Sequence, residues 1–252
     1  MDAFPLQLDP TVVLLLANAL ATRVTWSDSF RLVPAWQLGG PWAEHVGAVL
    51  ASVPEHEMGM AQTSAGLVAW HAADGLRVLS VLGAPDATPA QILRAAGEVA
   101  AGTSWPVSLF GLPLGVSPYG TLSEQTRDPG APDQQLSALL PAWTASATID
   151  LQHRATPVPG VGAALATLLR LSAGDLPAAA QTAKARFTRE GFEAAVVTAM
   201  ATRVSYRRGP PARHLELRFD RPYAAVGTPP WNGVPVVSAW VTEPSRIPPE
   251  DA

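Results

Sequence analysis

The sequence contains no cysteine, which excludes disulfide bonds and any chemistry that depends on a thiolate. It also lacks a long apolar run, since Val12–Leu16 is far shorter than the ~20 residues that a membrane-spanning helix requires. Asp2 and Asp9 stand where a secretory signal would carry positive charge, so we expect no signal peptide in this chain. Without a signal peptide, the chain as given is expected in the cytoplasm. The absence of cysteine does not indicate a cellular compartment.

Positive charge is scarce as well. The 17 Lys and Arg residues include a single lysine, Lys184, and are outnumbered by 21 Asp and Glu residues, which gives a net charge of −4. The arginines form no basic stripe, so we expect neither nucleic acid nor membrane as a partner.

Hydrophobic residues, in contrast, make up 48% of the 252 positions, which is enough for a substantial packed core. We find no internal repeat and no Ser/Gly-rich linker that would separate two domains. The sequence therefore predicts one domain over residues 1–252.

Motifs for catalysis or metal binding are incomplete. The segment Glu55–Met60 begins like a zinc-protease helix but lacks the second histidine four residues on, so we expect no metal site and no cofactor. Gly115–Gly120 approximates a nucleophile elbow around Ser117, but it is one residue too long, and Pro118 lacks the backbone N–H that an oxyanion hole needs. We interpret it as a turn. The five histidines are scattered along the sequence without pairing: His45, His56, His71, His153 and His214.

Periodicity predicts an α+β fold. Thr11–Val24 is a nearly unbroken run of β-branched residues and leucine, typical of a strand covered on both faces, and Thr88-Pro89 begins a clear helix. Further strands are expected within 46–53, 66–70, 76–82, 148–151 and 181–189, loops over 107–135, a helical patch over 135–140 and helical spacing over 161–171.

The stretch Arg186–Arg208 contains a strand that ends at a single glycine, Gly191, followed by small and β-branched residues. Such residues fit a pleated surface but are weak anchors for a buried strand. The segment Glu190–Thr198 resembles the hinge of the serpins, in which an acidic strand end and a glycine precede a run of alanines.

Two further blocks are similar to the same family and occur in the family's order. In the first, Asn18 lies in a leucine-rich strand and is followed by Trp26 and Phe30 at serpin spacing. The second comprises Leu217–Tyr223 and Pro235–Pro244, which resemble the last two core strands and the closing proline.

The resemblance implies serpin-like mixed β-sheets with helices and an exposed reactive-centre loop over about residues 191–214. It covers only the later part of a serpin, so we expect the N-terminal helical part to be absent. It also implies an inhibitor rather than an enzyme: a serine protease attacks the loop, and the freed loop inserts into the central sheet before the acyl-enzyme is hydrolysed. The family's usual location is the extracellular space.

Three groups of site residues follow from the resemblance. The hinge comprises Arg189, Glu190, Gly191, Phe192, Glu193, Ala194 and Ala195, and the shutter contact joins Asn18 to Gln181. The scissile bond would be Ser205–Tyr206, with Arg203, Arg207 and Arg208 as alternatives for a trypsin-like pocket.

Two hinge residues depart from the family pattern. Phe192 stands where inhibitory members have a small threonine, and Arg189 replaces the hinge glutamate. A non-inhibitory serpin-like binding scaffold, or an inactive remnant, is therefore the first alternative. An unrelated hydrolase that uses Ser117 is the second.

Overall fold

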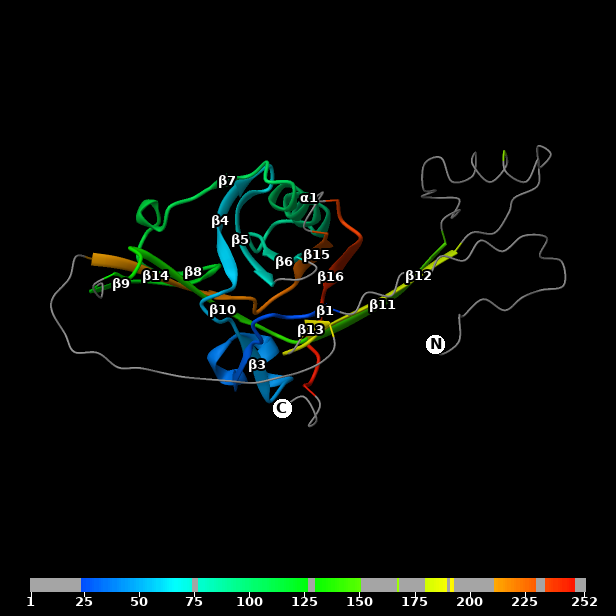
Figure 1. The fold of residues 1–252 in the computed structure, drawn as a ribbon, viewed down its shortest axis with the longest axis horizontal. Coiled ribbons are helices and arrows are strands. Elements are labelled where there is room, and N and C mark those ends of the chain that lie inside the picture. The colour runs from blue at the N-terminus through cyan, green and yellow to red at the C-terminus, as the bar shows by residue number, and fades with distance from the viewer. Residues whose placement is uncertain are drawn as a thin grey trace. The chain divides into compact units, whose positions relative to one another are not determined.

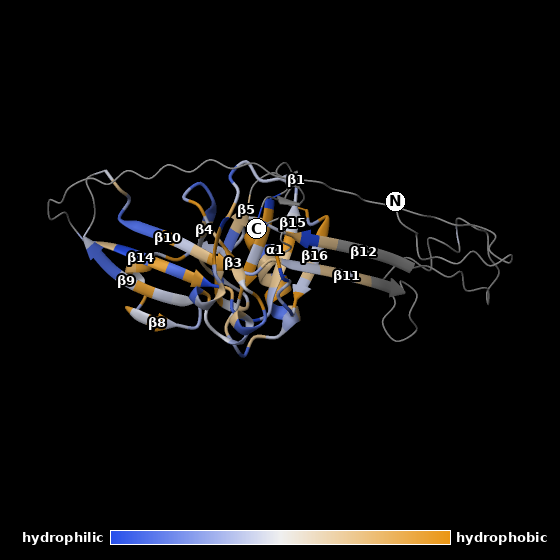
Figure 2. Cartoon of the chain, turned by 90° about the horizontal axis from the view of Figure 1, so that it is seen from below, coloured by the Kyte–Doolittle hydropathy of each residue, from blue (hydrophilic) through white to orange (hydrophobic). Residues whose placement is uncertain are grey.

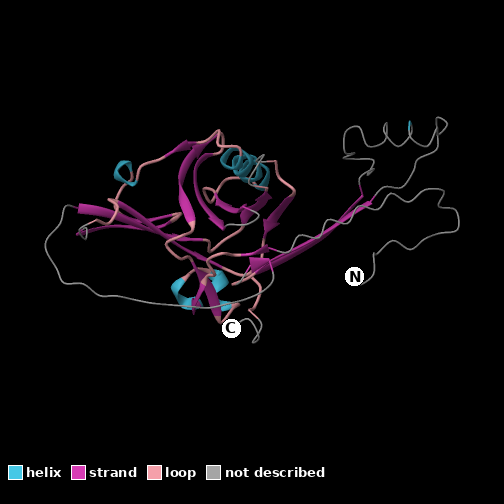
Figure 3. Ribbon diagram, in the orientation of Figure 1, coloured by secondary structure: helices cyan, strands magenta, loops and turns pink. Residues whose placement is uncertain are grey.

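A computed structural model describes residues 24–73, 77–126, 130–150, 167, 180–189, 191–192, 211–229 and 234–247. Residue contacts divide the chain into two units, one of residues 1–21 and 145–185 and the other of residues 22–144 and 186–252. Strands dominate the described part of both (Figure 3). No helix in the described ranges combines the length and the apolar character that a membrane span needs.

The larger unit contains a mixed six-stranded sheet in the order β2-β3-β10-β14-β9-β8. Strands β10 and β14 are parallel, whereas the other neighbouring pairs are antiparallel (Figure 1). The strands span Arg31–Pro34 (β2), Ala48–Ala51 (β3), Gln134–Leu140 (β10), Pro211–Arg218 (β14), Gly120–Thr126 (β9) and Gly115–Ser117 (β8).

A second six-stranded sheet in this unit is antiparallel throughout, in the order β16-β15-β6-β5-β4-β7. Its strands span Val237–Val241 (β16), Tyr223–Thr228 (β15), Arg77–Leu82 (β6), Gly66–Ala73 (β5), Glu57–Thr63 (β4) and Trp105–Pro106 (β7). All six residues of β15 are buried, as expected for a strand covered on both faces.

Helix α1 (Pro89–Ala100) packs on this antiparallel sheet. Thr88 and Gln91 form a reciprocal capping box at its start, and Pro89 occupies a first-turn position where its missing N–H costs nothing. Its buried face is Ile92, Ala95, Ala96 and Val99, which join Val68, Leu79 and Val226 in one hydrophobic cluster. Figure 2 shows hydrophobic residues gathered where α1 lies against the sheet. The predicted helix is confirmed.

The remaining elements are short or stand apart from these sheets. Strand β1 (Val24–Thr25) pairs with β13 (Gly191–Phe192), and β11 (Trp143–Asp150) pairs with β12 (Ala180–Phe187). Residues 145–150 and 180–185 of the latter pair belong to the smaller unit. Three short 3-10 helices are Ala35–Gln37 (η1), Pro41–Glu44 (η2) and Leu109–Gly111 (η3).

The predicted fold class is confirmed, since mixed β-sheets are combined with a helix. Strands β3, β5, β6, β12 and β16 lie where they were expected. The block Leu217–Tyr223, which resembles part of the last two core strands of a serpin, contains the end of β14 and the start of β15.

Two predictions were wrong, and one strand was missed. The expected helical patch over 135–140 is strand β10, because its short apolar run is paired on both sides by β14 and β3. The expected loops over 107–135 contain the hairpin of β8 and β9. Glu57–Thr63, which sequence reasoning did not assign to a strand, forms β4. The strand predicted over 11–24 and the helix over 161–171 lie outside the described residues, except for Val24 and Thr167.

Candidate functional site

Strand β13 lies at the position predicted to be the hinge, shortly after the end of β12. β12 ends at Phe187, and four residues later Gly191 pairs with Thr25 while Phe192 pairs with Val24. The β1–β13 pairing is antiparallel. Two of the predicted hinge residues, Gly191 and Phe192, thus pair with residues at and just beyond the C-terminal end of the strand predicted over 11–24.

Three buried aromatic rings lie together at the end of β12. Trp26 and Phe30 lie 6.3 Å apart, and Phe187 lies 5.4 Å from each of them, measured between ring centroids. All three side chains are at most 2% exposed. Trp143 stacks on Phe187 with the two ring planes almost parallel and the ring centroids 5.9 Å apart. Together these contacts fix the end of β12 against the segment that follows β1.

Two hydrogen bonds hold the residue before the hinge and the first hinge residue. The Trp26 indole Nε1 donates to the Thr188 carbonyl at 3.1 Å, and the Phe30 backbone N–H donates to the Arg189 carbonyl at 3.0 Å. The Arg189 Nε is buried and has no hydrogen-bond partner in the described part of the chain. The backbone here is therefore held by two hydrogen bonds, while the Arg189 Nε is left without one.

Two histidine rings pack against the Phe30 ring. His56 Nδ1 and His71 Nε2 are 3.0 Å apart, and His56 Nε2 lies 2.7 Å from the Asp28 carbonyl. The Phe30 ring is 4.5 Å from the His56 ring and 5.3 Å from the His71 ring. His71 is fully buried, and desolvation together with the neighbouring His56 lowers its pKa well below the ordinary value.

The prediction that the histidines are unpaired was therefore wrong for this pair. His56 precedes β4 and His71 lies on β5, and the antiparallel register that sets Met58 opposite His71 brings the two rings together. A histidine inside the apolar strand Gly66–Ala73 was the only sequence signal.

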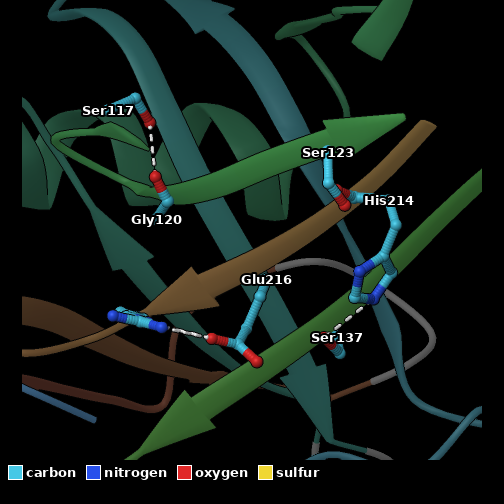
Figure 4. A network of polar contacts seen from close by, with 7 residues as sticks. Ser117, Gly120, Ser123, Ser137, His214 and Glu216 are labelled. Carbon is cyan, nitrogen blue, oxygen red and sulfur yellow. Dashed lines mark hydrogen bonds and ion pairs between the residues drawn. The ribbon is translucent and has the colours of Figure 1, made fainter. Parts of the chain in front are cut away.

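A cavity of about 640 Å³ opens beside His56. It is lined by polar and charged side chains from several strands, including Arg31, Glu57, Gln135, Ser137 and His214, together with the edge of Trp70. Ser137 Oγ and His214 Nε2 are 3.2 Å apart across β10 and β14 (Figure 4).

This serine and histidine do not complete a catalytic triad with the neighbouring acid. Glu216, two residues along β14 from His214, is bound instead by Arg218 at 2.9 and 2.8 Å (Figure 4). Ser117, the other serine considered for hydrolysis, donates to the Gly120 carbonyl at 3.1 Å within the β8–β9 turn. The interpretation of that segment as a turn is confirmed.

Only part of the predicted site lies in the described residues. Arg189, Gly191 and Phe192 do, and Gln181 lies in β12, with only its backbone described. Outside the described residues are Asn18, Glu190, Glu193, Ala194, Ala195, Arg203, Ser205, Tyr206, Arg207 and Arg208.

No family model and no curated protein matches this sequence. Solved structures with a similar fold include thyroxine-binding globulin in complex with thyroxine, at 13% identity and a TM-score of 0.44, covering 88% of this chain and 54% of that one. Human glycosylated kallistatin has 15% sequence identity and a TM-score of 0.45, and the match covers 89% of this chain and 54% of kallistatin. Serpin48 of the insect Tenebrio molitor has 12% sequence identity and a TM-score of 0.39, and the match covers 88% of this chain and 53% of Serpin48. The chain is thus structurally similar to serpins and spans about half the length of these structures.

Proposed function

We propose that this chain is a serpin-like inhibitor of serine proteases and is consumed as a suicide substrate. The single observation that carries the proposal is the antiparallel pairing of Gly191 and Phe192 with β1. An inserted loop strand must leave β12, turn back and run antiparallel to the central strand. The first two residues of the proposed loop already have this direction.

The β1–β13 register also supports the length of the proposed loop. The residue numbers in each pair add up to 216, with Val24 opposite Phe192 and Thr25 opposite Gly191. If the same register continued during insertion, Ser205 would reach Thr11, the first residue of the strand predicted over 11–24. The predicted central strand is therefore long enough to accept the loop as far as the proposed scissile bond, Ser205–Tyr206.

In this mechanism the partner is a serine protease, which carries out the chemical step, and the chain itself catalyses no reaction. The protease serine attacks the carbonyl of Ser205 and forms an acyl-enzyme, with release of the amine of Tyr206. Insertion of the freed strand then adds backbone hydrogen bonds along the central strand, and the attached protease is carried away from its productive geometry before water attacks.

The first alternative is a non-inhibitory scaffold or inactive remnant of the same fold. Arg189 favours this alternative, because a buried guanidinium nitrogen without a hydrogen bond destabilises the structure at the start of the proposed hinge. Phe192 favours it as well, since a bulky residue at the first inserting position slows insertion and lets the protease finish hydrolysis.

Denaturing gel electrophoresis distinguishes the two functions. The full chain is mixed with trypsin-like, chymotrypsin-like and elastase-like proteases, and the products are boiled before loading. A band at the summed mass of chain and protease is expected, together with a released C-terminal peptide that begins at Tyr206. Clipped chain with fully active protease, and no such band, would refute inhibition and identify the scaffold.

A further inference from the structure

The hydrogen bonds of His56 and His71 define a neutral pair. The Asp28 carbonyl can only accept, so His56 Nε2 carries a hydrogen and donates to it at 2.7 Å. In a neutral His56 the Nδ1 atom is then a bare acceptor. His71 Nε2 therefore donates to His56 Nδ1 at 3.0 Å, and His71 Nδ1 is left without a hydrogen.

A proton added to this pair changes His71 Nδ1 whichever ring takes the charge. If His71 is charged, both of its nitrogens carry hydrogens. If His56 is charged, its Nδ1 must donate to His71 Nε2, and the hydrogen of His71 moves to Nδ1. This atom is buried and has no hydrogen-bond partner among the described residues. Acidification therefore creates a buried donor and a buried charge together.

The surroundings of His71 Nδ1 carry no compensating negative charge in the described part of the chain. Ser80 lies opposite His71 on β6, so the two side chains share a face of the sheet. The Ser80 and Tyr223 hydroxyls are also fully buried, and they interact with each other. Burial raises the pKa of Tyr223, so its phenol stays neutral over the physiological range.

The same pair supports the residues that hold the hinge. Asp28, which receives the His56 hydrogen bond, lies two residues before Phe30. Phe30 covers both imidazole rings with its own ring, and its N–H binds the Arg189 carbonyl. A displacement of either imidazole ring would therefore disturb its contact with Asp28 or Phe30, and Phe30 in turn holds the Arg189 carbonyl.

We propose that the His56–His71 pair is a proton-operated latch on the hinge: neutral, it holds Phe30 against the end of β12, and protonated, it releases the β1–β13 pairing. The cavity of about 640 Å³ gives solvent protons access, because His56 is one of its lining residues while His71 lies buried behind it. The charged and titratable groups around the pair are Asp28, Arg31, Glu55, Glu57, Arg189 and His214. Of these, Glu57 is already bound to Arg77 at 3.2 Å.

The pKa of His71 gives the direction of the latch. Its folded-state pKa is lowered, first by desolvation and second by His56, so the closed form binds a proton less readily than an open form with an ordinary pKa of about 6.5. Falling pH therefore favours the open form, and the latch is closed above about pH 6.5.

Hydrogen exchange followed by mass spectrometry tests the latch on the full chain. Exchange of peptides covering residues 24–30 and 187–192 is compared at pH 7.5 and 5.5, after correction for the chemical exchange rate, with α1 as the internal reference. We expect up to about tenfold faster corrected exchange at pH 5.5 in the hinge peptides, because one group with an open-form pKa of about 6.5 can change the open-to-closed equilibrium by no more than that between pH 7.5 and 5.5, and we expect no comparable change in α1.

Two sets of variants test whether the His56–His71 pair causes the pH dependence of hydrogen exchange. His56→Gln and His71→Gln keep a side chain that donates and accepts but does not titrate, and each should abolish the pH response. The triple variant His45→Gln/His153→Gln/His214→Gln retains only the pair and should keep the response. A flat wild-type profile, a response that survives His71→Gln, or its loss in the triple variant would overturn the proposal. If both single variants fail to fold, the wild type and the triple variant still decide.

The regulatory meaning of the latch rests on the proposed inhibitory function. The exchange measurement uses no protease, so a flat profile refutes the latch while leaving inhibition untouched. Failure to trap a protease likewise refutes inhibition and leaves the latch intact.

Discussion

The Trp26 indole donates a hydrogen bond to the Thr188 carbonyl at 3.1 Å and so joins two residues that are 162 positions apart in the sequence. The bond is buried, and the ring also packs against Phe187 at 5.4 Å. One side chain thus connects the residue after β1 to the last residues before the proposed hinge. A change at Trp26 acts on that connection directly.

Trp26→Phe should reduce the free energy of unfolding by about 1–3 kcal/mol, because it removes the donor, leaves the Thr188 carbonyl unpaired and keeps most of the ring contacts. Urea denaturation followed by circular dichroism measures the loss. Trp36→Phe is the matched control: Trp36 is 76% exposed, and the same substitution there should stay within about 0.5 kcal/mol. Equal effects of the two substitutions would contradict the assigned role of the indole.

Stability should also depend on pH through His71. Its pKa is lowered in the folded state, so the unfolded chain binds more protons between the folded pKa and the unfolded value of about 6.5. The free energy of unfolding is therefore at its full value above about pH 6.5 and decreases as the pH falls toward the folded pKa. Urea midpoints measured from pH 8 to pH 5 test this sign.

The comparison variant for that titration is His71→Gln. We expect its midpoints to decrease less between pH 6.5 and pH 5 than those of the wild type. Identical slopes in the two proteins would show that other groups cause the pH dependence.

Gly120 is the position in the mixed sheet where a side chain is least tolerated. Its φ is +145°, and a Cβ atom built there would lie 1.8 Å from the Glu216 carbonyl oxygen on β14. Gly120→Ala should therefore separate β9 from β14 and destabilise the protein by about 2–4 kcal/mol. Thermal unfolding followed by circular dichroism measures the change.

Gly97 provides the opposite expectation for the same substitution. It lies inside α1, and a Cβ atom there meets no other atom within 4 Å. Gly97→Ala should raise stability by about 0.5–1 kcal/mol, because alanine loses less backbone entropy in a helix. A loss at Gly97 as large as that at Gly120 would show that the cost is not steric.

The sequence singled out Trp26 and Phe30 only because their spacing resembles that of serpins. Their contacts with Phe187 were not predicted, since they join segments far apart in the sequence. The helix beginning at Pro89 was predictable for a local reason: a capping threonine, a first-turn proline and helical apolar spacing all lie within one segment.

The errors arose where pairing between distant segments decides the structure. Gln135–Leu140 has a short apolar run that suits a helix or a strand, and its parallel pairing with β14 selects the strand. The His56–His71 contact depends on the β4–β5 register, which the separation of the two histidines in the sequence does not reveal. Local pattern is thus informative for α1 and uninformative for these two features.

The alternation of side chains along the proposed inserted strand gives the strongest test of the inhibitory mechanism. Residues an even number of positions from Phe192, such as Ala194, share its face, whereas Ala195 lies on the opposite face. The β1–β13 register that starts the strand at Phe192 fixes this alternation. The face that contains Phe192, Ala194, Val196 and Thr198 is the apolar one, and we expect it to be buried on insertion.

Ala194→Arg should therefore place a guanidinium in the core when the loop inserts, which slows insertion enough for the protease to complete hydrolysis. We expect at least about a tenfold fall in the ratio of boiled complex to clipped chain on a denaturing gel. Ala195→Arg adds the same charge one residue away on the outer face and should leave the ratio within about twofold of the wild type. Equal losses from the two substitutions would mean that the loop does not enter the sheet as an alternating strand, and the inhibitory mechanism would have to be abandoned even if the chain is cleaved.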